Sequence, residues 1–160
     1  MKFKPHDLTW LEEPIFPHDD YGALASLQRE VGIPLAAGEN LCTRYQFAQM
    51  IAGNAVSYVQ PSITKVGGVT EFLQVARLTR AHDLQLMPHS PYFGPGWLAT
   101  LQVMSTCPDP GYVERLFMDH DAYLYGDYVH PIDGAFKVPD GPGLGLEPDP
   151  DVIKAYRICN

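Results

Sequence analysis

Cysteine and positive charge are both scarce in this 160-residue chain, and each shortage excludes a class of protein. The three cysteines, Cys42, Cys107 and Cys159, are odd in number and share no short metal-ligand spacing. Neither a disulfide framework nor a cysteine zinc site is therefore expected. Lys and Arg total 11 against 19 Asp and Glu, and the net charge of −8 has the wrong sign for binding a nucleic acid or an anionic membrane.

Long hydrophobic runs are also missing. No uninterrupted apolar run approaches the roughly 20 residues that cross a bilayer, and the N-terminus lacks the apolar stretch of a secretory signal. No Gly-x-Gly-x-x-Gly sequence follows a candidate strand, so the dinucleotide-binding fingerprint is missing as well. We expect a soluble, cytoplasmic protein with no nucleic-acid or membrane partner.

What the chain does contain is enough apolar residue to fold, with 46% hydrophobic and 19% charged residues. Its β-rich runs are short, nearly continuously apolar and about 22–28 residues apart; they cover 8–12, 34–38, 57–60, 84–87 and 112–114. Strands that are apolar without alternation fit a parallel sheet buried on both faces, and the spacing leaves room for one helix after each strand. The pattern predicts an α/β fold of about five βα units.

Helical patterns fill the intervals between these strands. One helix is expected to run to Val31, capped by Asp19 or Asp20 and ended by Gly32. Further helices are expected near 47–51, 69–82, 96–104 and 149–157. From about residue 119 Gly and Pro become frequent, so residues 119–160 are predicted to form a C-terminal tail after a strand–helix portion that spans 1–118.

Five parallel strands could form an open doubly wound sheet or part of a (β/α) barrel. A whole barrel needs about 250 residues, so only part of one fits this length. Each predicted strand ends in polar residues that do not belong in a core: Glu12 and Glu13, Glu39 and Asn40, Gln60 and Ser62, His89, and Glu114. Because the carboxyl ends of parallel strands share one face, these side chains are expected to converge there. This convergence favours the barrel.

Two of these carboxylates, Glu12 and Glu39, come from consecutive strands. Two carboxylates held close together repel one another unless a cation neutralises them, and ligation by oxygen alone favours Mg²⁺. A magnesium site is one interpretation of the pair, and two solvated strand ends is the other. His89, between Pro88 and Pro91, could serve as a general acid or base, or could simply be hydrogen-bonded at the rim.

Taken together, the strand-end sequences resemble the mandelate racemase branch of the enolase superfamily. The matching segments agree in order and spacing; they are 10–14 (WLEEP), 38–40 (GEN), 60–61 (QP), 65–70 (KVGGVT), 88–90 (PHS) and 113–116 (VERL). The resemblance implies strands four to eight of a modified TIM barrel. It also implies the superfamily's chemistry, in which Mg²⁺ stabilises an enediolate formed by proton abstraction.

The resemblance also implies roles for individual residues. Glu12 and Glu39 look like two of the family's three Mg²⁺ ligands, and His89 looks like its seventh-strand acid or base. Glu114 looks like the eighth-strand acid that hydrogen-bonds a substrate carboxylate or enolate oxygen, which would require it to be protonated. Lys65 would have a positional role in its Lys-x-Gly-Gly turn. Glu13 and Asn40, beside the matched glutamates, are expected to support the site or to bind substrate.

Two departures from the family pattern bear on the function. Ser62 stands where the family has an Asp that orients the histidine, or a Lys base, and a serine cannot stabilise imidazolium with a charge. The family's capping domain, second-strand base and third-strand Asp would lie before Met1, and the tail resembles the segment that returns to that domain. We therefore expect the chain by itself to be inactive and to associate with itself or with a complementary chain.

The function expected for the parent protein is magnesium-dependent dehydration of an acid sugar, a small-molecule carboxylate. A base would remove the proton alpha to the carboxylate, and His89 would protonate the departing hydroxyl. A weakly oriented histidine suits a general acid better than one of two matched bases. The alternatives are racemisation or epimerisation of a hydroxy acid, and a non-catalytic fragment or structural subunit.

Overall fold

A computed structural model describes residues 2–158 of the chain. Four short strands, each followed by a helix, make up the first two thirds. They are β1 (Leu11–Glu12), α1 (Tyr21–Val31), β2 (Leu35–Ala37), α2 (Arg44–Ala52), β3 (Tyr58–Val59), α3 (Val69–Ala81), β4 (Gln85–Leu86) and α4 (Pro95–Met104). The ends of the described chain add the 3₁₀ turns η1 (Lys4–His6) and η2 (Gly126–Val129) and the short helix α5 (Pro150–Tyr156).

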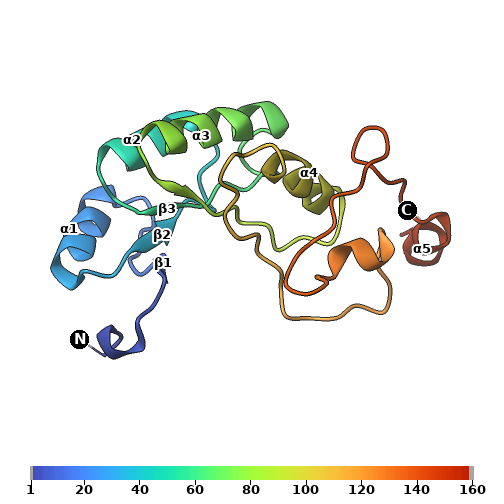
Figure 1. Ribbon diagram of the computed structural model, residues 1–160, viewed down its shortest axis with the longest axis horizontal. Coiled ribbons are helices and arrows are strands. Elements are labelled where there is room, and N and C mark those ends of the chain that lie inside the picture. Colours follow the sequence, from blue (N-terminus) through green and yellow to red (C-terminus); the bar gives the residue numbers. More distant parts are fainter. Residues whose placement is uncertain (1, 159–160) are drawn as a thin grey trace.

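The four strands form one parallel sheet in the order β1-β2-β3-β4. Sequential order with one helix in each crossover is what a barrel segment requires, because each strand lies beside the next along the chain. Helices α1, α2 and α3 arch around one side of the sheet (Figure 1). The predicted parallel α/β architecture is therefore confirmed.

The main core lies between the sheet and these three helices. Leu24, Leu35, Phe47, Val59 and Phe72, which come from α1, β2, α2, β3 and α3, are all completely buried. Strand residues on both sides of β2 are buried, as the continuously apolar pattern predicted. This packing fixes the carboxyl ends of the strands relative to one another.

Local signals place the ends of the first helices. The Asp20 carboxylate accepts a hydrogen bond from the Ala23 amide at 2.9 Å, and Gly32 closes α1 with a φ of 64°. Both ends agree with the sequence. Helix α2 begins with a capping box between Thr43 and Gln46, which the sequence analysis did not identify.

The predicted fifth strand, residues 112–114, is wrong as a regular strand. The segment still runs beside the end of β4, but side chains hold it there. The Glu114 amide donates to Ser90 Oγ at 2.9 Å, and that hydroxyl donates to the Glu114 carbonyl at 3.0 Å. A backbone ladder is prevented because Pro88 and Pro91 have no N–H to donate. The described sheet consequently has four strands rather than five.

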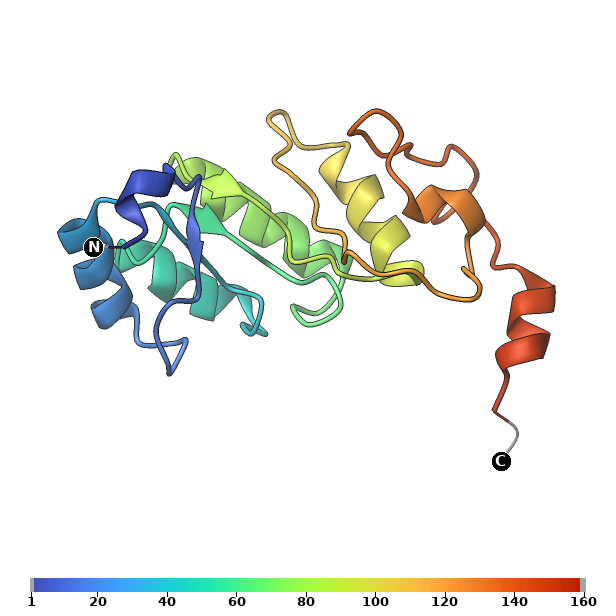
Figure 2. The ribbon, with the colours of Figure 1, turned by 90° about the horizontal axis from the view of Figure 1, so that it is seen from below.

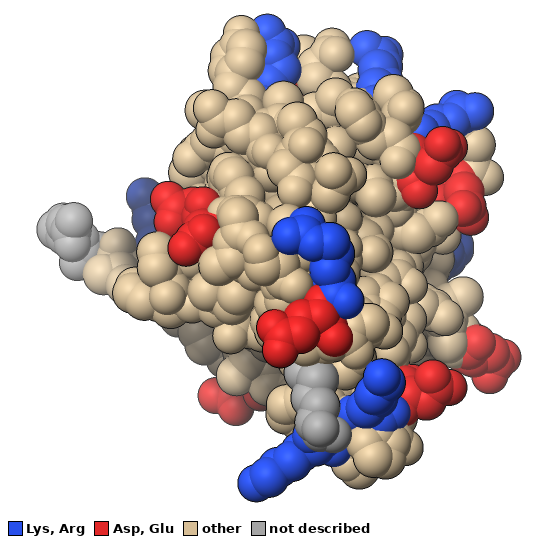
Figure 3. Space-filling model, turned by 90° about the vertical axis from the view of Figure 1, so that its left-hand side faces the viewer, with Lys and Arg blue, Asp and Glu red and all other residues tan. Residues whose placement is uncertain are grey.

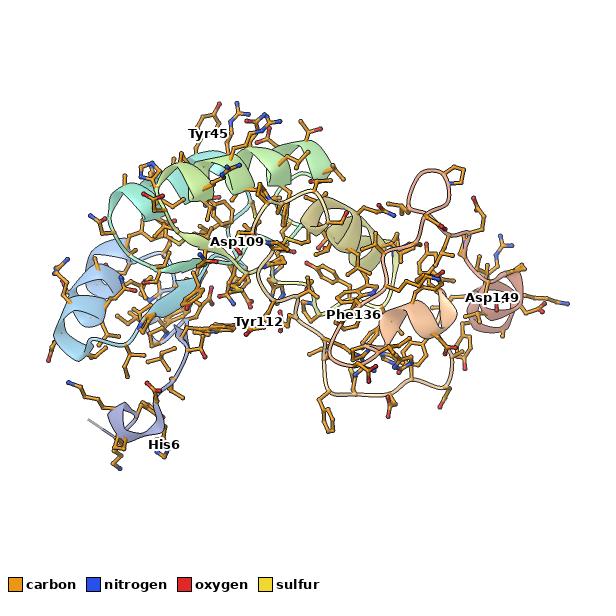
Figure 4. All side chains as sticks on the ribbon, viewed as in Figure 1. His6, Tyr45, Asp109, Tyr112, Phe136 and Asp149 are labelled. Carbon is orange, nitrogen blue, oxygen red and sulfur yellow. The ribbon has the colours of Figure 1, made fainter. Side chains whose placement is uncertain are left out.

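The tail after residue 119 packs on α4 instead of trailing from it. Trp97, Leu98 and Leu101 of α4 form a second apolar cluster with Tyr125 and Val129, and the Trp97 indole donates to the Tyr128 carbonyl at 2.9 Å. This lobe lies beyond the sheet in Figure 2. Helix α5, which is capped by Asp149, labelled in Figure 4, has no buried residue and stands at the far end of the molecule.

Charged side chains of both signs are spread over the face shown in Figure 3, with acidic and basic groups near one another. Within residues 2–158, no helix combines the length and the apolar character that a membrane crossing demands.

Candidate functional site

The histidine after β4 joins carboxylates from two other parts of the chain. His89 Nδ1 lies 3.1 Å from Glu39 Oε2 and 3.1 Å from Glu114 Oε2. Neither oxygen is aligned as a hydrogen-bond acceptor, so both are charge contacts, attractive when the imidazole carries its proton. The His89 side chain is only 14% exposed, whereas those of Glu39 and Glu114 are 26% and 39% exposed. A mostly buried ring thus sits between two partly solvated carboxylates.

Glu114 is held as a carboxylate in this arrangement. Contact with the His89 ring and a 3.3 Å hydrogen bond from the Ser90 amide lower its pKa, and this effect outweighs the partial burial that would raise it. The role that the family resemblance implies for Glu114 needs a proton on this carboxyl when the intermediate forms, and that role stays a prediction. The neighbouring His89 and Ser90 groups favour the ionised form of Glu114.

Glu12 is fixed from the side of β3. The buried Gln60 donates from Nε2 to Glu12 Oε2 at 2.8 Å, and the Trp10 indole donates to the same oxygen at 3.2 Å. Gln60 follows β3, and Glu12 ends β1, so this bond passes across the end of β2. Glu12 therefore faces the same edge of the sheet as Gln60.

Asn40 connects Glu13, which follows β1, with Glu39, which follows β2. Its amide nitrogen lies 3.2 Å from Glu13 Oε2 and 3.3 Å from Glu39 Oε1, and its oxygen accepts from Lys65 Nζ at 3.4 Å. Lys65 Nζ is also 3.9 Å from Glu39 Oε1. Glu13 has a φ of 36°, in the left-handed region that disfavours a residue with a side chain. A supporting role for Glu13, Asn40 and Lys65 remains a prediction, and these contacts are consistent with it.

Ser62 does not contact the histidine through a hydrogen bond. It is fully buried, and its hydroxyl pairs with the Tyr92 hydroxyl and, at 3.1 Å, with Thr64 Oγ1. Thr64 also donates to the Tyr92 hydroxyl at 3.0 Å. The Tyr92 ring lies edge-on to His89 with the ring centres 6.1 Å apart. Around this histidine, charge comes from Glu39 and Glu114, while Ser62 belongs to a neighbouring group of hydroxyls.

The donor chemistry at this edge suits Mg²⁺ in part. Glu12 and Glu39 offer the carboxylate oxygens that Mg²⁺ prefers, and the buried oxygens Glu13 Oε1 and Gln60 Oε1 have no partner in the described chain. Across residues 2–158, however, no group of three or more His, Cys, Asp and Glu side chains is arranged to hold a metal ion. The residues therefore fit an incomplete ligand set that further oxygen ligands would have to complete.

A cavity of about 610 Å³ lies elsewhere, between α3, β4 and the segment that follows α4, and shares no residue with this edge. Its lining includes Arg77, Arg80, Cys107 and Asp109, and Asp109 is labelled near the middle of Figure 4. Burial raises the pKa of the Cys107 thiol, which makes it less reactive. Nothing in this cavity matches the chemistry of the strand ends.

No individual role was predicted for Gln60, Thr64, Tyr92 or Ser90. Gln60 was expected at the shared face because it follows a buried strand, like the glutamates, but its bond to Glu12 was not predicted. Tyr92 and Thr64 could not be recognised from the sequence, since each lies in a loop and approaches the site through the fold alone.

A parallel βα series with carboxylates and a histidine gathered after its strands defines a portion of a (β/α) barrel. The comparison with known families agrees: the family described as "Enolase C-terminal domain-like" matches residues 1–152. The chain belongs to this family. The resemblance to the mandelate racemase branch of the enolase superfamily is thereby confirmed.

Curated relatives carry names from sugar-acid metabolism. A D-galactarolactone cycloisomerase from Agrobacterium fabrum is 30% identical over 161 residues, which cover 94% of this chain and 42% of the relative. A D-galactonate dehydratase from Xanthomonas oryzae pv. oryzae is 30% identical over 162 residues, which cover 95% of this chain and 41% of the relative. The chain thus spans about two fifths of the length of these relatives.

Among solved structures, a mandelate racemase/muconate lactonizing protein from Paracoccus denitrificans, complexed with magnesium, has the same fold. It superposes with a TM-score of 0.86 at 30% identity, over 96% of this chain and 42% of that protein. This likeness places the four described strands in the barrel domain of such proteins.

Proposed function

We propose that this chain supplies one side of an active site that dehydrates an acid sugar. The observation that carries the proposal is the contact of His89 Nδ1 with both Glu39 and Glu114 at 3.1 Å. It is supported by the family and by the D-galactonate dehydratase among the relatives. The ligand class is a small polyhydroxylated carboxylate.

His89 is the proton donor to the departing hydroxyl. Because its Nδ1 faces two carboxylates, Nε2 is the ring nitrogen left to meet a ligand. The carboxylates attract the protonated ring, so the imidazolium that must deliver a proton has its charge balanced in place. Glu114, which is not among the residues that would hold Mg²⁺, thereby does the work that an aspartate at the position of Ser62 would otherwise do.

The reaction balances as loss of water. A base takes the proton from the carbon next to the substrate carboxylate, the bond from the neighbouring carbon to its hydroxyl breaks, and His89 gives that hydroxyl its proton. The resulting enol becomes a keto acid. The base for the first step is not assigned to a described residue, since Lys65, the lysine at this edge, contacts Glu39 and Asn40.

Glu12 and Glu39 would hold Mg²⁺, which, when bound, would offset the charge of the carboxylates and stabilise the negative charge of an enediolate. The role of Gln60 and Trp10 is then to keep Glu12 at the shared edge. Two protein carboxylates leave most of the coordination sphere to water, substrate or other groups.

The cycloisomerase among the relatives favours a second candidate, isomerisation of a sugar-acid lactone. It shares the first proton transfer and differs in the bond that breaks next.

A chimera tests the proposal: the chain replaces the matched region of the Xanthomonas D-galactonate dehydratase. We expect a folded chimera to form a keto acid from D-galactonate with Mg²⁺, whereas the isolated chain forms none. His89→Asn should abolish the reaction, and the matched change His82→Asn, directly after α3, should leave it intact. Keto-acid formation that persists in His89→Asn would exclude the role given to this residue.

A further inference from the structure

A closed ring of three hydroxyl groups lies beside His89. Thr64 Oγ1 donates to the Tyr92 hydroxyl at 3.0 Å, the Tyr92 hydroxyl pairs with Ser62 Oγ, and Ser62 Oγ lies 3.1 Å from Thr64 Oγ1. With the first donor fixed, the consistent order is Thr64 to Tyr92, Tyr92 to Ser62 and Ser62 to Thr64. Each hydroxyl then donates one hydrogen bond and accepts one within the ring.

The surrounding fold brings these hydroxyls together. A Cβ at Gly96, in the first turn of α4, would lie 2.6 Å from Thr64 Cγ2 and 3.3 Å from Tyr92 Cδ2. Only a residue without a side chain therefore lets α4 approach both. The ring joins the loop after β3 to the loop after β4, and Ser62, completely buried, is its inner member.

The proton count of the ring determines what it can bind. Its three O–H groups are all used inside the ring, so none is left to donate to a ligand. Each oxygen accepts only one hydrogen bond there and retains one further acceptor position. A ligand hydroxyl can donate to such an oxygen, whereas a carboxylate, which only accepts, cannot bond without breaking the ring.

We propose that the Ser62–Thr64–Tyr92 ring is a subsite for a hydroxyl group of the ligand. The ligand class, a polyhydroxy acid, rests on the proposed function. Ligand access is from Thr64, which is exposed, and Tyr92, which is half-buried. A hydroxyl held there lies beside His89, because the centres of the Tyr92 and His89 aromatic side chains are 6.1 Å apart. The ring therefore favours a ligand hydroxyl over a carboxylate and directs the carboxylate end of the ligand elsewhere.

The test is a titration of the 160-residue chain with three ligands, followed by NMR signals of Ser62, Thr64 and Tyr92. The ligands are D-galactonate, the neutral polyol galactitol and n-hexanoate, which has the acid group without hydroxyls. We expect both polyols to shift these signals and hexanoate to leave them in place. Tyr92→Phe and Thr64→Val should each weaken polyol binding between about twofold and tenfold, the effect of one neutral hydrogen bond.

Matched controls are Tyr156→Phe on α5 and Thr70→Val on α3, which remove the same hydroxyls outside the ring and should leave polyol binding unchanged. Galactitol separates this subsite from the proposed function. Polyol binding that depends on Tyr92, with no added effect of the acid group, would keep the subsite and remove the sugar-acid role. Galactonate binding that is sensitive to Glu39→Gln but not to Tyr92→Phe and Thr64→Val would overturn the subsite alone. Failure of both polyols to shift the ring signals would also overturn it.

Discussion

Gln60 Nε2 donates a 2.8 Å hydrogen bond to Glu12 Oε2, across the end of the strand that lies between them. Gln60 is only 4% exposed, and its other polar atom, Oε1, has no partner in the described chain. The bond therefore orients the amide as well as the carboxylate. It ties the first strand to the third at the edge where the candidate site lies.

This bond predicts the effect of an isosteric change. Gln60→Glu replaces the donating N–H₂ by an oxygen close to Glu12 and should lower the free energy of unfolding by about 1–3 kcal/mol at pH 7. The loss should shrink at about pH 4, where one of the two carboxyls can hold a proton. Urea unfolding at both pH values measures this loss of stability. An equal loss at pH 7 and at about pH 4 would contradict repulsion between the two carboxylates.

Gly38, at the end of β2, should not tolerate a side chain. It has a φ of 130°, and a Cβ there would lie 2.8 Å from Phe47 Cε1 and 3.3 Å from the Gln60 backbone. Gly38→Ala should cost about 1–3 kcal/mol of stability. The control is Gly22→Ala in α1, where the nearest atom is 3.6 Å away and helix propensity predicts a small gain. Thermal unfolding of both variants measures the difference. An equal effect of the two substitutions would contradict the close packing at Gly38.

The lowered pKa of Glu114 predicts an acid-dependent contribution to stability. Because the folded-state value lies below the ordinary 4.5, the native state binds fewer protons than the unfolded state in this range. The contribution is present above pH 4.5 and is lost as the pH falls through the folded pKa. Glu114→Gln should therefore be less stable than the natural chain at pH 7, by an amount that shrinks toward pH 3. Denaturant midpoints of Glu114→Gln and of the natural chain that move further apart as the pH falls would contradict the predicted direction.

The edges of the sheet predict association. Within the described chain, β1 and β4 each have one neighbouring strand, and Phe16 and Phe117 are at least 91% exposed. Unpaired strand edges and exposed aromatic side chains favour contact with a second copy or a complementary chain. Light scattering at micromolar concentration should show particles larger than a monomer, reduced by Phe117→Ser. A monomer that unfolds cooperatively would contradict the expectation.

The parts of the fold that could be predicted from sequence were those with local causes. Asp20 and Gly32 set the ends of α1, and continuously apolar runs identified the buried parallel strands. The segment 112–114 has the composition of a strand, but Pro88 and Pro91 in the neighbouring chain have no N–H to donate. The Ser90 amide between them bonds to the Glu114 side chain instead of to the backbone. That reason lies in tertiary pairing and is not a property of the segment itself.

The site shows the same division. Glu39, His89 and Glu114 could be brought together from sequence because parallel strands place their carboxyl ends on one face. The hydrogen-bond partner of each side chain could not be predicted from the sequence. Ser62 was expected beside the histidine, but it pairs with Tyr92 and Thr64, two loop residues whose positions depend on the approach of α4 at Gly96. The division into residues 1–118 and 119–160 as separate portions stays a prediction.

The central claim is that Glu12 and Glu39 lie at one shared edge of the sheet together with His89 and Glu114. Mn²⁺ tests it most directly as a paramagnetic substitute for Mg²⁺. In NMR spectra of the chain, weakly bound Mn²⁺ should broaden the signals of these four residues before others, because broadening falls steeply with distance. Glu12→Gln or Glu39→Gln should remove the selective broadening, while Glu147→Gln on the tail should preserve it. Broadening centred elsewhere, or unaffected by changing both site glutamates, would contradict the account.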